Sequence, residues 1–382
     1  MKIINELNAK GKKVILRCDL NVSIKDGKIV SDERIIKSLP TIEYLINENA
    51  KVIIMSHLGK IKTKEDCEKN SLFLVYQRLC ELLKTNVYFS SATSGEILEN
   101  KINSLQNGEV LLMENTRYED LDGKKESNCD LNLAKYWASL ADYFVNDAFG
   151  LSHRKHASNY GISKYLPSAI GFLMKTEITG LKSLINPIKP YVVIMGGAKI
   201  EDKLDIIENI LPKCDYLLVG GKIANSFLDC VSNIGASEVD ESKKDNLKKL
   251  LFIYKERIIL PVDVKVLSEG IVKEKDINEI TDTDIIYDIG NKTTSLYKEY
   301  IKNAKTIFLN GTMGMYEDER FKDGTLNILK CVASSNEVHI IGGGDAISSA
   351  KVFNITGFSF VSTGGGATLE YIATNKLNCF ED

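Results

Sequence analysis

Short apolar runs, rich in valine and isoleucine, recur along the chain, and stretches with the spacing of amphipathic helices separate them. The runs do not alternate with polar residues, which is typical of strands that are buried on both faces of a sheet. Repeated strand–helix units predict a mainly parallel sheet with helices on both sides. Two clear helical patterns cover Ile36–Asn47 and Asn132–Leu140. The predicted strands are Val14–Leu16, Val52–Met55, Val110–Met113, Tyr143–Val145, Val192–Met195, Tyr216–Val219, Ile258–Leu260, Thr306–Leu309, Val338–Ile341 and Phe358–Val361.

The length of 382 residues is too great for one ordinary hydrophobic core and predicts two domains. A helical pattern over Gly171–Ile185 is followed by Pro187 and Pro190, which end it. We interpret this segment as a helix that connects two doubly wound, Rossmann-like parallel-sheet domains. The expected boundaries are 1–169 for the first domain, 170–186 for the connecting helix and 187–367 for the second domain.

The composition argues against several classes of protein. A formal net charge of −3 disfavours a broad nucleic-acid-binding surface. The polar N-terminal stretch is unlike a signal peptide and the longest apolar runs are strand-sized, so neither secretion nor a membrane span is expected. The eight cysteines are scattered without a C-x-x-C pair, which indicates reduced thiols and a cytoplasmic protein.

Charged and polar side chains follow the predicted strands of the N-terminal half. Ligands of open α/β sheets bind beyond the carboxyl ends of the strands, so these residues are candidates for a site. Any one of them could be an ordinary solvated loop residue. As a set, with Arg34 in a turn-like segment nearby, they predict a pocket for a small, multiply negative ligand, because guanidinium groups match phosphate and carboxylate oxygens. The residues are Arg17, Asp19 and Asn21; Ser56, His57, Gly59 and Lys60; Glu114, Asn115 and Arg117; and Asn146, Asp147, His153, Arg154 and His156.

Glycines follow the predicted strands of the C-terminal half instead. Glycine lets backbone N–H groups approach a ligand closely, and a helix N-terminus behind them favours an anion. One such pair could be a tight turn without a ligand, but five strand ends of this kind suit a di- or triphosphate. Asp345 could hold Mg²⁺ on those phosphates, or cap a helix, or both. The segments are Gly196–Lys199, Gly220–Gly221, Asn310–Thr312, Gly342–Asp345 and Gly364–Gly366.

Two common nucleotide motifs are missing from the sequence. No G-x-x-x-x-G-K-[ST] is present, which disfavours a P-loop enzyme. No G-x-G-x-x-G follows a predicted strand, which disfavours a dinucleotide-dependent oxidoreductase.

The motifs that remain resemble those of the phosphoglycerate kinase family, in the family's order and along nearly the whole chain. GGAK-x-x-DK together with DAFG-x-x-HR-x-H is the most specific combination. The matching segments are RCDLNV (Arg17–Val22), DERI (Asp32–Ile35), SHLG (Ser56–Gly59), ENTRY (Glu114–Tyr118), NDAFGLSHRKHAS (Asn146–Ser158), GGAKIEDK (Gly196–Lys203), GG (Gly220–Gly221), NGTMG (Asn310–Gly314), GGGD (Gly342–Asp345) and STGGGATLE (Ser362–Glu370).

The resemblance implies a hinge-bending protein of two doubly wound domains, whose C-terminal tail, 368–382, returns to the first domain. It implies reversible phosphoryl transfer between MgATP and the carboxylate of 3-phosphoglycerate, with ATP made in glycolysis. The protein would be a monomer acting on small molecules, with Mg²⁺ as the metal and neither nucleic acid nor membrane as a partner.

The resemblance also assigns roles to residues of this sequence. The phosphoglycerate site would comprise Asp19, Asn21, Arg34, His57, Lys60, Arg117 and Arg154. The nucleotide site would comprise Gly197, Lys199, Lys203, Gly221, Asn310, Glu317, Gly344, Asp345 and Ala346, with Glu317 on the ribose and Asp345 on the metal. The groups at the transferring phosphoryl would be Arg34, Lys199, Gly343 and Gly365.

The sequence departs from the family pattern at a few positions. Lys60 stands where arginine is usual, Asn291 and Thr312 stand where proline is usual, and Ala346 replaces a hydroxyl residue. These changes leave open a divergent paralogue that phosphorylates another small carboxylate. A non-catalytic nucleotide-binding protein is a further alternative, which the presence of Arg34, Lys199 and Asp345 disfavours.

Overall fold

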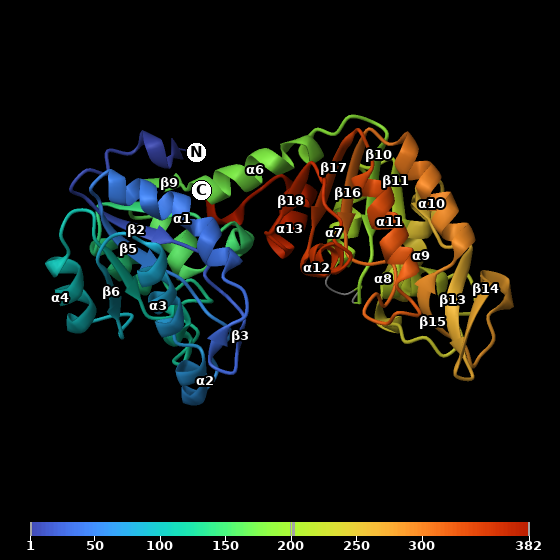
Figure 1. Cartoon of the computed structure of the whole chain (residues 1–382), viewed down its shortest axis with the longest axis horizontal. Helices are drawn as coiled ribbons and strands as arrows, with labels where there is room; N and C mark the ends of the chain where they lie inside the picture. Colours follow the sequence, from blue (N-terminus) through green and yellow to red (C-terminus); the bar gives the residue numbers. More distant parts are fainter. Residues whose placement is uncertain (1, 199, 201–202, 381–382) are drawn as a thin grey trace. The chain divides into compact units, whose positions relative to one another are not determined.

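The computed structural model describes residues 2–198, 200 and 203–380, which form two compact units. The first unit runs to Thr179 and takes in the chain again from Lys376, and the second unit is Gly180–Asn375. The boundary falls within α6 (Phe172–Ile185), and the helix predicted over Gly171–Ile185 is confirmed. Each unit contains a parallel sheet covered by helices on both faces (Figure 1).

The first unit contains a seven-stranded sheet in the order β1-β9-β8-β2-β5-β7-β6, and every neighbouring pair is parallel. Its strands are β1 (Lys2–Ile3), β2 (Lys13–Arg17), β5 (Lys51–Met55), β6 (Val87–Ser90), β7 (Val110–Met113), β8 (Tyr143–Asn146) and β9 (Ser168–Ile170). A short hairpin consists of β3 (Ile24–Lys25) and β4 (Lys28–Ile29). The helices of the first unit are α1 (Glu33–Asn47), α2 (Lys64–Lys69), α3 (Phe73–Leu82), α4 (Glu96–Ser104) and α5 (Leu131–Ser139).

Two hydrophobic clusters explain the unbroken apolar runs of this sheet. Val14 and Leu16 of β2 belong to one buried cluster, whereas Ile15 between them belongs to the other. Successive side chains of a strand point to opposite faces, so a strand between two helical layers must be apolar at every position. The register then aligns Arg17 with Met55 and with Asn146. Residues after these three positions therefore gather at one edge of the sheet.

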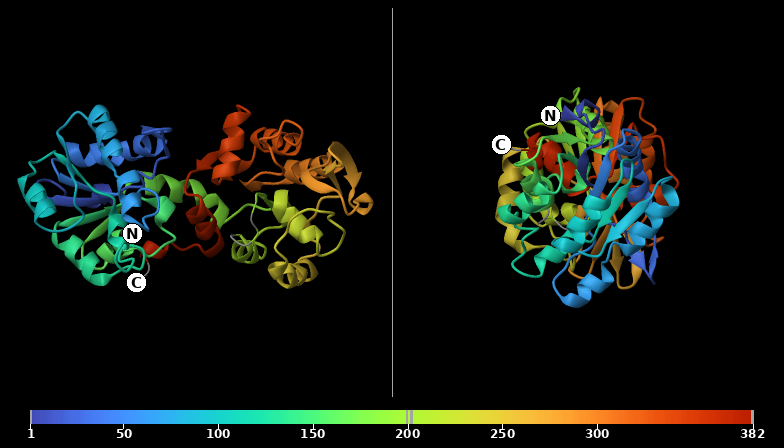
Figure 2. Two further views of the ribbon diagram at one scale, coloured as in Figure 1. Left: turned by 90° about the horizontal axis from the view of Figure 1, so that it is seen from below. Right: turned by 90° about the vertical axis from the view of Figure 1, so that its left-hand side faces the viewer.

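The second unit contains a six-stranded parallel sheet in the order β12-β11-β10-β16-β17-β18, visible from other directions in Figure 2. Its strands are β10 (Tyr191–Met195), β11 (Tyr216–Val219), β12 (Ile258–Ile259), β16 (Thr306–Asn310), β17 (Val338–Gly342) and β18 (Phe360–Ser362). Its helices are α7 (Leu204–Ile210), α8 (Gly221–Leu228), α9 (Lys244–Ile253), α10 (Asn291–Asn303), α11 (Asp323–Ala333), α12 (Gly344–Val352) and α13 (Gly366–Thr374).

A three-stranded antiparallel sheet in the second unit was not predicted. It pairs β14 (Ile271–Asp276) with β13 (Asp263–Ser268), and β13 with β15 (Ile285–Ile289). Buried and partly exposed positions alternate along β13, and β14 is largely exposed. These strands therefore lack the continuous apolar runs by which the parallel strands were recognised.

The connecting helix α6 begins where two side chains of the first unit meet its free N–H groups. The Asp147 carboxylate accepts a hydrogen bond from the Met174 amide at 3.0 Å, and the Thr41 hydroxyl accepts one from the Phe172 amide at 2.9 Å. The first N–H groups of a helix have no partner within the helix, so these contacts fix its start.

The segment that returns to the first unit begins at Lys376, later than the expected 368. Helix α13 stays in the second unit, where the Lys213 ammonium donates to the carbonyls of Ile372 and Ala373 at 3.0 and 2.5 Å. Beyond it, the Asn378 side-chain amide donates to the His153 carbonyl at 2.7 Å, and the Cys379 backbone amide donates to the Ser152 carbonyl at 3.1 Å. The return is therefore short, and one side-chain and one backbone hydrogen bond hold it.

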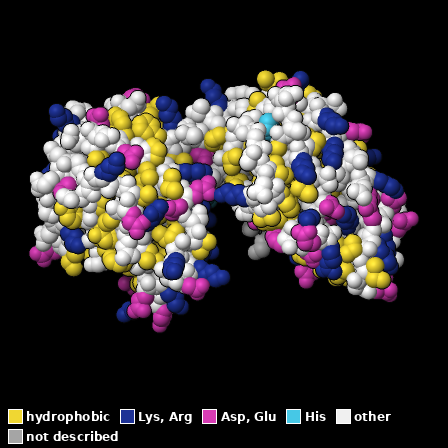
Figure 3. All heavy atoms as spheres, viewed as in Figure 1, with side chains coloured by type: hydrophobic (Ala, Val, Ile, Leu, Met, Phe, Trp, Pro, Cys, Tyr) yellow, Lys and Arg dark blue, Asp and Glu magenta, His cyan; other side chains and the backbone are white. Residues whose placement is uncertain are grey.

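Charged side chains of both signs occur on the surface (Figure 3), and the cysteines are free. Lys and Arg side chains are interspersed with Asp and Glu over the face shown in Figure 3. All eight cysteines carry free thiols. Among the helices that the structure describes, none combines the length and the apolar character needed to cross a bilayer.

Candidate functional site

Arg17 ends strand β2 and is fully buried at the carboxyl edge of the first sheet. Its Nε donates to the Ser158 hydroxyl at 2.8 Å, and one terminal nitrogen donates to the Cys18 carbonyl at 2.5 Å. Its other terminal nitrogen lies 3.4 Å from Nδ1 of His57. The donors of Arg17 thus bind protein atoms, and one of them orients His57. The positive charge of Arg17 stays buried below the residues that follow the strands.

Glu126 supplies a buried negative charge behind Arg17. Its carboxylate accepts from the Ser158 hydroxyl at 2.5 Å and from the Ser158 amide at 2.9 Å, and it lies 3.8 Å from Nδ1 of His156. Ser158 therefore bridges a guanidinium and a carboxylate that are both fully buried. Buried charges need such partners, because an unpaired one carries a large desolvation cost. Sequence reasoning missed Glu126, since it follows none of the predicted strands.

Asp19 and Asn21 bind Arg34 and the Gly59 backbone at the same edge of the sheet. Asp19 forms an ion pair with Arg34, whose side chain is 45% exposed against 11% for Asp19. The Asn21 side-chain oxygen accepts from the Gly59 amide at 2.9 Å, next to the exposed Lys60. Arg34 lies in the first turn of α1, so the prediction of a turn-like segment around it is wrong.

Arg117 and Arg154 complete the basic set. Arg117 lies in a 3-10 helix (Thr116–Asp120), 3.3 Å from the Ser127 hydroxyl and 3.6 Å from the Asp120 carboxylate. Its Nε is buried without a hydrogen-bond partner in the described part of the chain. Arg154 is exposed, and its Nε donates to Nε2 of His153 at 3.1 Å. The expected residues therefore follow the carboxyl ends of β2, β5, β7 and β8, with Arg34 joined to them through Asp19.

The three histidines of this edge are held neutral. Burial, together with the charges of Arg17 and Arg117, lowers the pKa of His57 well below its usual range. The same causes lower the pKa of His156 to about 3, and burial beside Arg154 lowers the pKa of His153 to about 4. A neutral imidazole can donate or accept a hydrogen bond without adding repulsion among the guanidinium groups.

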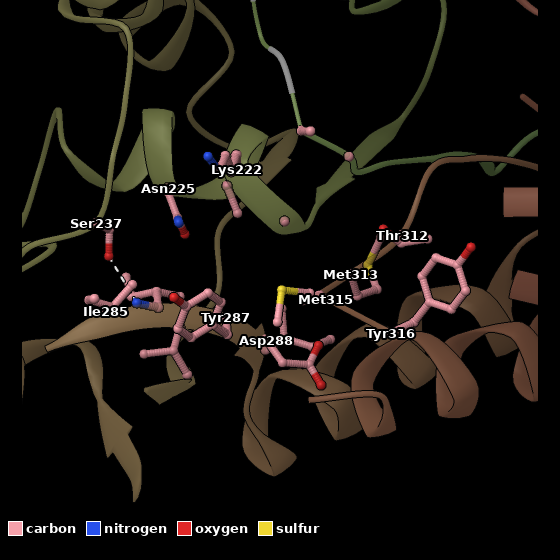
Figure 4. Close-up of a pocket in the computed structure, with 18 of the residues that line it drawn as sticks. Lys222, Asn225, Ser237, Ile285, Tyr287, Asp288, Thr312, Met313, Met315 and Tyr316 are labelled. Carbon is pink, nitrogen blue, oxygen red and sulfur yellow. Dashed lines mark hydrogen bonds between the residues drawn. The ribbon is translucent and has the colours of Figure 1, made fainter. Parts of the chain in front are cut away.

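The second unit contains a cavity of about 530 Å³ at the glycine-rich edge of its sheet. The expected residues Gly197, Gly221, Glu317 and Asp345 line it. Side chains from α8, from β15 and from the segment after β16 make up most of its wall (Figure 4). Its size and partly apolar lining are those of a pocket for a nucleotide-sized ligand.

Other expected residues fix the backbone around the cavity. The Lys203 ammonium donates to the Gly196 carbonyl at 2.8 Å and to the Asn310 side-chain oxygen at 2.7 Å. The Asn310 side-chain amide nitrogen donates to the Gly342 carbonyl at 2.9 Å. These contacts tie together the ends of β10, β16 and β17. Lys199, expected at the transferring phosphoryl group, lies outside the described residues.

Glycine is required at two of the helix starts. Gly343 and Gly365 are the residues before α12 and α13, and their φ angles are +91° and +56°. A Cβ on Gly343 would lie 2.5 Å from the Asn310 side chain. Both residues thus leave the helix N-termini, which begin at Gly344 and Gly366, open to an anion. Ala346 is fully buried within α12, and the structure leaves none of its atoms exposed.

The departures from the family pattern are accommodated by local contacts. Asn291 donates to the Glu274 carboxylate from its backbone at 2.8 Å and from its side chain at 2.7 Å. A proline could make neither bond. The Thr312 carbonyl accepts from the Gly197 amide at 3.1 Å. The loops at these positions are therefore cross-linked by hydrogen bonds.

Asp288 is a buried carboxylate in the cavity wall that sequence reasoning missed. One oxygen accepts from the Gly324 amide at 2.8 Å, at the start of α11. The other has no hydrogen-bond partner among the residues described, and it fills the space that a Cβ on Gly314 or Gly324 would need. Burial raises the pKa of Asp288 to about 7. Its position near the end of β15, two residues before Gly290, was the available signal.

Comparisons with known proteins identify the family of the chain. The phosphoglycerate kinase family model matches residues 4–375. The chain is 46% identical to the phosphoglycerate kinase of Macrococcus caseolyticus and 47% identical to that of Fusobacterium nucleatum, in each case over 98% of this chain and 97% of the relative.

Solved structures give the same result. The phosphoglycerate kinase of Coxiella burnetii is similar with a TM-score of 0.86 and 36% identity, over 98% of this chain and 96% of that one. The enzyme of Pyrococcus horikoshii is similar with a TM-score of 0.85 and 34% identity, over 99% of this chain and 97% of that one.

The histidines give a first prediction. In the ligand-free protein, the ring-proton NMR signals of His57, His153 and His156 should not titrate between about pH 5.5 and 8, because their pKa values lie below that range. A midpoint near the ordinary histidine value of about 6.5 for any of them would contradict the buried, arginine-rich environment described above.

Asp288 gives a second prediction. Its pKa is higher in the folded than in the unfolded chain, so its contribution to stability is present at low pH and is lost as the pH rises through about 7. Replacing it by the neutral isostere, Asp288→Asn, removes that loss. The free energy of unfolding of the variant relative to the native chain should rise by about 2–3 kcal/mol between pH 5 and pH 8. A difference that stays constant with pH in denaturant titrations would refute the assignment.

Proposed function

The chain belongs to the phosphoglycerate kinase family, and we propose from its two anion sites which residues carry each part of the reaction. It is a phosphotransferase with a carboxyl group as acceptor, and it acts in glycolysis. The observation that carries the proposal is the difference between the sites. One presents guanidinium groups and neutral imidazoles, and the other presents glycine-lined helix starts around a nucleotide-sized cavity.

In the proposed first site, Arg34, Lys60, Arg117 and Arg154 bind the negative groups of 3-phosphoglycerate, and His57 donates a hydrogen bond to it. Asp19 and Asn21 act on the site through the Arg34 and Gly59 contacts described above. Guanidinium groups suit carboxylate and phosphate because their planar fork can bind two oxygens at once. Arg34 is the proposed contact to the reacting carboxylate, and its half-exposed side chain leaves it free to approach a ligand.

In the proposed second site, Gly197, Lys203, Gly221, Asn310 and Gly344 place the phosphates of ATP or ADP, and Glu317 binds the ribose. The positive φ of Gly221, +58°, and its close approach to Gly197 support backbone contacts to the nucleotide. Lys203 and Asn310 support it through the loop contacts that they make with each other.

The residues fit a nucleotide-bound Mg²⁺. Asp345 is an exposed carboxylate in the first turn of α12, and it lines the cavity. The described residues contain no group of three or more His, Cys, Asp or Glu side chains able to hold a metal by themselves. Mg²⁺ would therefore be held jointly by the phosphates and Asp345, and it would neutralise charge on the transferring group.

The chemistry needs no general base. The attacking carboxylate of 3-phosphoglycerate is already ionised, so its oxygen forms the new P–O bond while the bond from the γ-phosphorus to ADP breaks with its electron pair. We propose that Lys199 follows the moving phosphoryl group, and that N–H groups at Gly343 and Gly365 bind its oxygens. These groups stabilise charge that is spread over the transition state.

The remaining assignments extend the same proposal. A monomer that acts on small molecules is part of it. The eight free thiols support a reducing, cytoplasmic location. No observation favours a divergent paralogue acting on another carboxylate. A coupled assay with 3-phosphoglycerate and MgATP tests the function as a whole, and no turnover there would overturn it.

Lys199 gives a third prediction. Lys199→Met should lower kcat by about 10²-fold, or on the order of 3 kcal/mol, because the lysine acts mainly in the transition state. The KM for ATP should change little. Lys249→Met, on the exposed face of α9, is a charge-matched control and should leave both constants unchanged. A variant of Lys199 with normal kcat and a raised KM would show a role in ground-state binding only.

Lys60 gives a fourth prediction. Lysine keeps the charge of the family's usual arginine but loses its planar fork. Lys60→Arg should lower the KM for 3-phosphoglycerate several-fold, consistent with about 1 kcal/mol from one better charge-assisted hydrogen bond. Lys60→Ala should raise that KM. The control is Lys62→Ala, which removes an exposed lysine two positions further along the same loop. If Lys60 and Lys62 variants behave alike, Lys60 is not part of the site.

A further inference from the structure

Ser158 lies between two buried charges of opposite sign in the first unit. Its hydroxyl oxygen is 2.8 Å from Nε of Arg17 and 2.5 Å from the Glu126 carboxylate, and all three residues are fully buried. A guanidinium has donors and no acceptor, so Arg17 must donate to the hydroxyl oxygen. The hydroxyl proton then goes to one oxygen of Glu126, and the Ser158 backbone amide donates to the other at 2.9 Å. Glu126 therefore holds Ser158 by two hydrogen bonds, and Ser158 holds Arg17.

The same reasoning locates the proton of His57. One terminal nitrogen of Arg17 lies 3.4 Å from Nδ1 of His57. Because Arg17 can only donate, Nδ1 of His57 is the acceptor in this contact. Burial and the neighbouring arginines lower the pKa of His57 well below its usual range, so the ring is neutral and carries a single proton. That proton is therefore on Nε2.

Nε2 is the ring nitrogen of His57 that remains for a ligand. The described residues make hydrogen bonds to Nδ1 and to the backbone carbonyl of His57, and none to Nε2. His57 follows β5 and is 7% exposed, at the edge that carries the arginines. An N–H group at Nε2 can donate to an anion, whereas the other tautomer would turn a lone pair toward it. The position of one proton thus decides whether His57 attracts or repels the substrate.

Two contacts set the plane of the Arg17 guanidinium. One terminal nitrogen donates to the Cys18 carbonyl at 2.5 Å and lies 3.5 Å from the Met55 carbonyl. The Ser158 hydroxyl holds the opposite end of the group, at Nε. With only one end held, the guanidinium could turn, and its remaining N–H groups would no longer be directed at Nδ1 of His57. The hydroxyl of Ser158 is therefore the second fixed point that this contact needs.

We propose that Ser158 is a positioning residue for 3-phosphoglycerate binding, which holds Arg17 against Nδ1 of His57 and so keeps the imidazole proton on Nε2 for donation to the substrate. This inference rests on the proposed function of the first site. Ser158 itself does not touch the substrate, because it is fully buried and acts through two other side chains. Site groups bind well only when supporting hydrogen bonds lock their orientation.

The first test is the tautomer of His57 in the ligand-free protein, read from the ¹⁵N NMR shifts of its two ring nitrogens. The native chain should show a protonated Nε2 and an unprotonated Nδ1. In Ser158→Ala, both shifts should move toward the average of the two tautomers, because Arg17 no longer holds Nδ1. A proton on Nδ1 in the native chain overturns the inference, and this measurement decides even if a variant fails to fold.

The second test is steady-state kinetics at saturating MgATP. Ser158→Ala should raise the KM for 3-phosphoglycerate about tenfold, as expected for the loss of one hydrogen bond to a charged group. Both kcat and the KM for ATP should stay within about twofold of the native values. Ser158→Cys should behave in the same way, because it keeps the size of the side chain but is only a weak donor and acceptor. It guards against an effect of the cavity that alanine leaves.

The matched control is Ser90→Ala, at the end of β6 in the same sheet. Ser90 is equally buried, and its hydroxyl bonds only to the backbone of Ala92, at 2.9 and 3.3 Å. It should keep the native KM and the native His57 spectrum.

The inference is overturned if both Ser158 variants keep the native KM for 3-phosphoglycerate. A parallel loss for both substrates would show a general structural role and would equally overturn it. A native chain that shows the expected tautomer but no turnover with 3-phosphoglycerate and MgATP would instead overturn the proposed function, so the two failures are distinguishable.

Discussion

The first unit depends on concentrating positive charge at one sheet edge without breaking the fold. Arg17 is fully buried, and its charge is balanced through Ser158 by the equally buried Glu126. The histidines contribute hydrogen-bonding atoms but no charge, because burial and the arginines lower their pKa values. The edge can therefore present Arg34, Arg117 and Arg154 to an anion, since the repulsion among them is not increased by neighbouring imidazoles.

The second unit offers backbone N–H groups, in place of charged side chains, to an anionic ligand. Its parallel register brings the ends of β10, β16 and β17 to one level, and the Lys203 and Asn310 side chains cross-link the loops that follow. Preorganised N–H groups need not reorient when an anion binds or when its charge moves. The two units thus share a sheet architecture and differ in whether side chains or backbone supply the positive potential.

The sequence predicted the parallel strands because double-sided burial demands unbroken apolar runs, and it predicted the site edges because those runs end in distinctive residues. It could not reveal Glu126 or the bridging role of Ser158. Arg17 and Ser158 are 141 residues apart, and their contact exists only through tertiary packing. The antiparallel strands β13–β15 were missed because their half-exposed pattern is weaker.

The return of the chain to the first unit has a consequence for biosynthesis. The contacts from Asn378 and Cys379 to residues 152 and 153 are made by a segment that the ribosome synthesises after the whole second unit. The first unit can form its sheet early, but the loop carrying Arg154 lacks these contacts until residue 379 has emerged. Folding on the ribosome would therefore leave that loop incompletely anchored during the synthesis of about half the chain, a period in which chaperones or proteases could engage it.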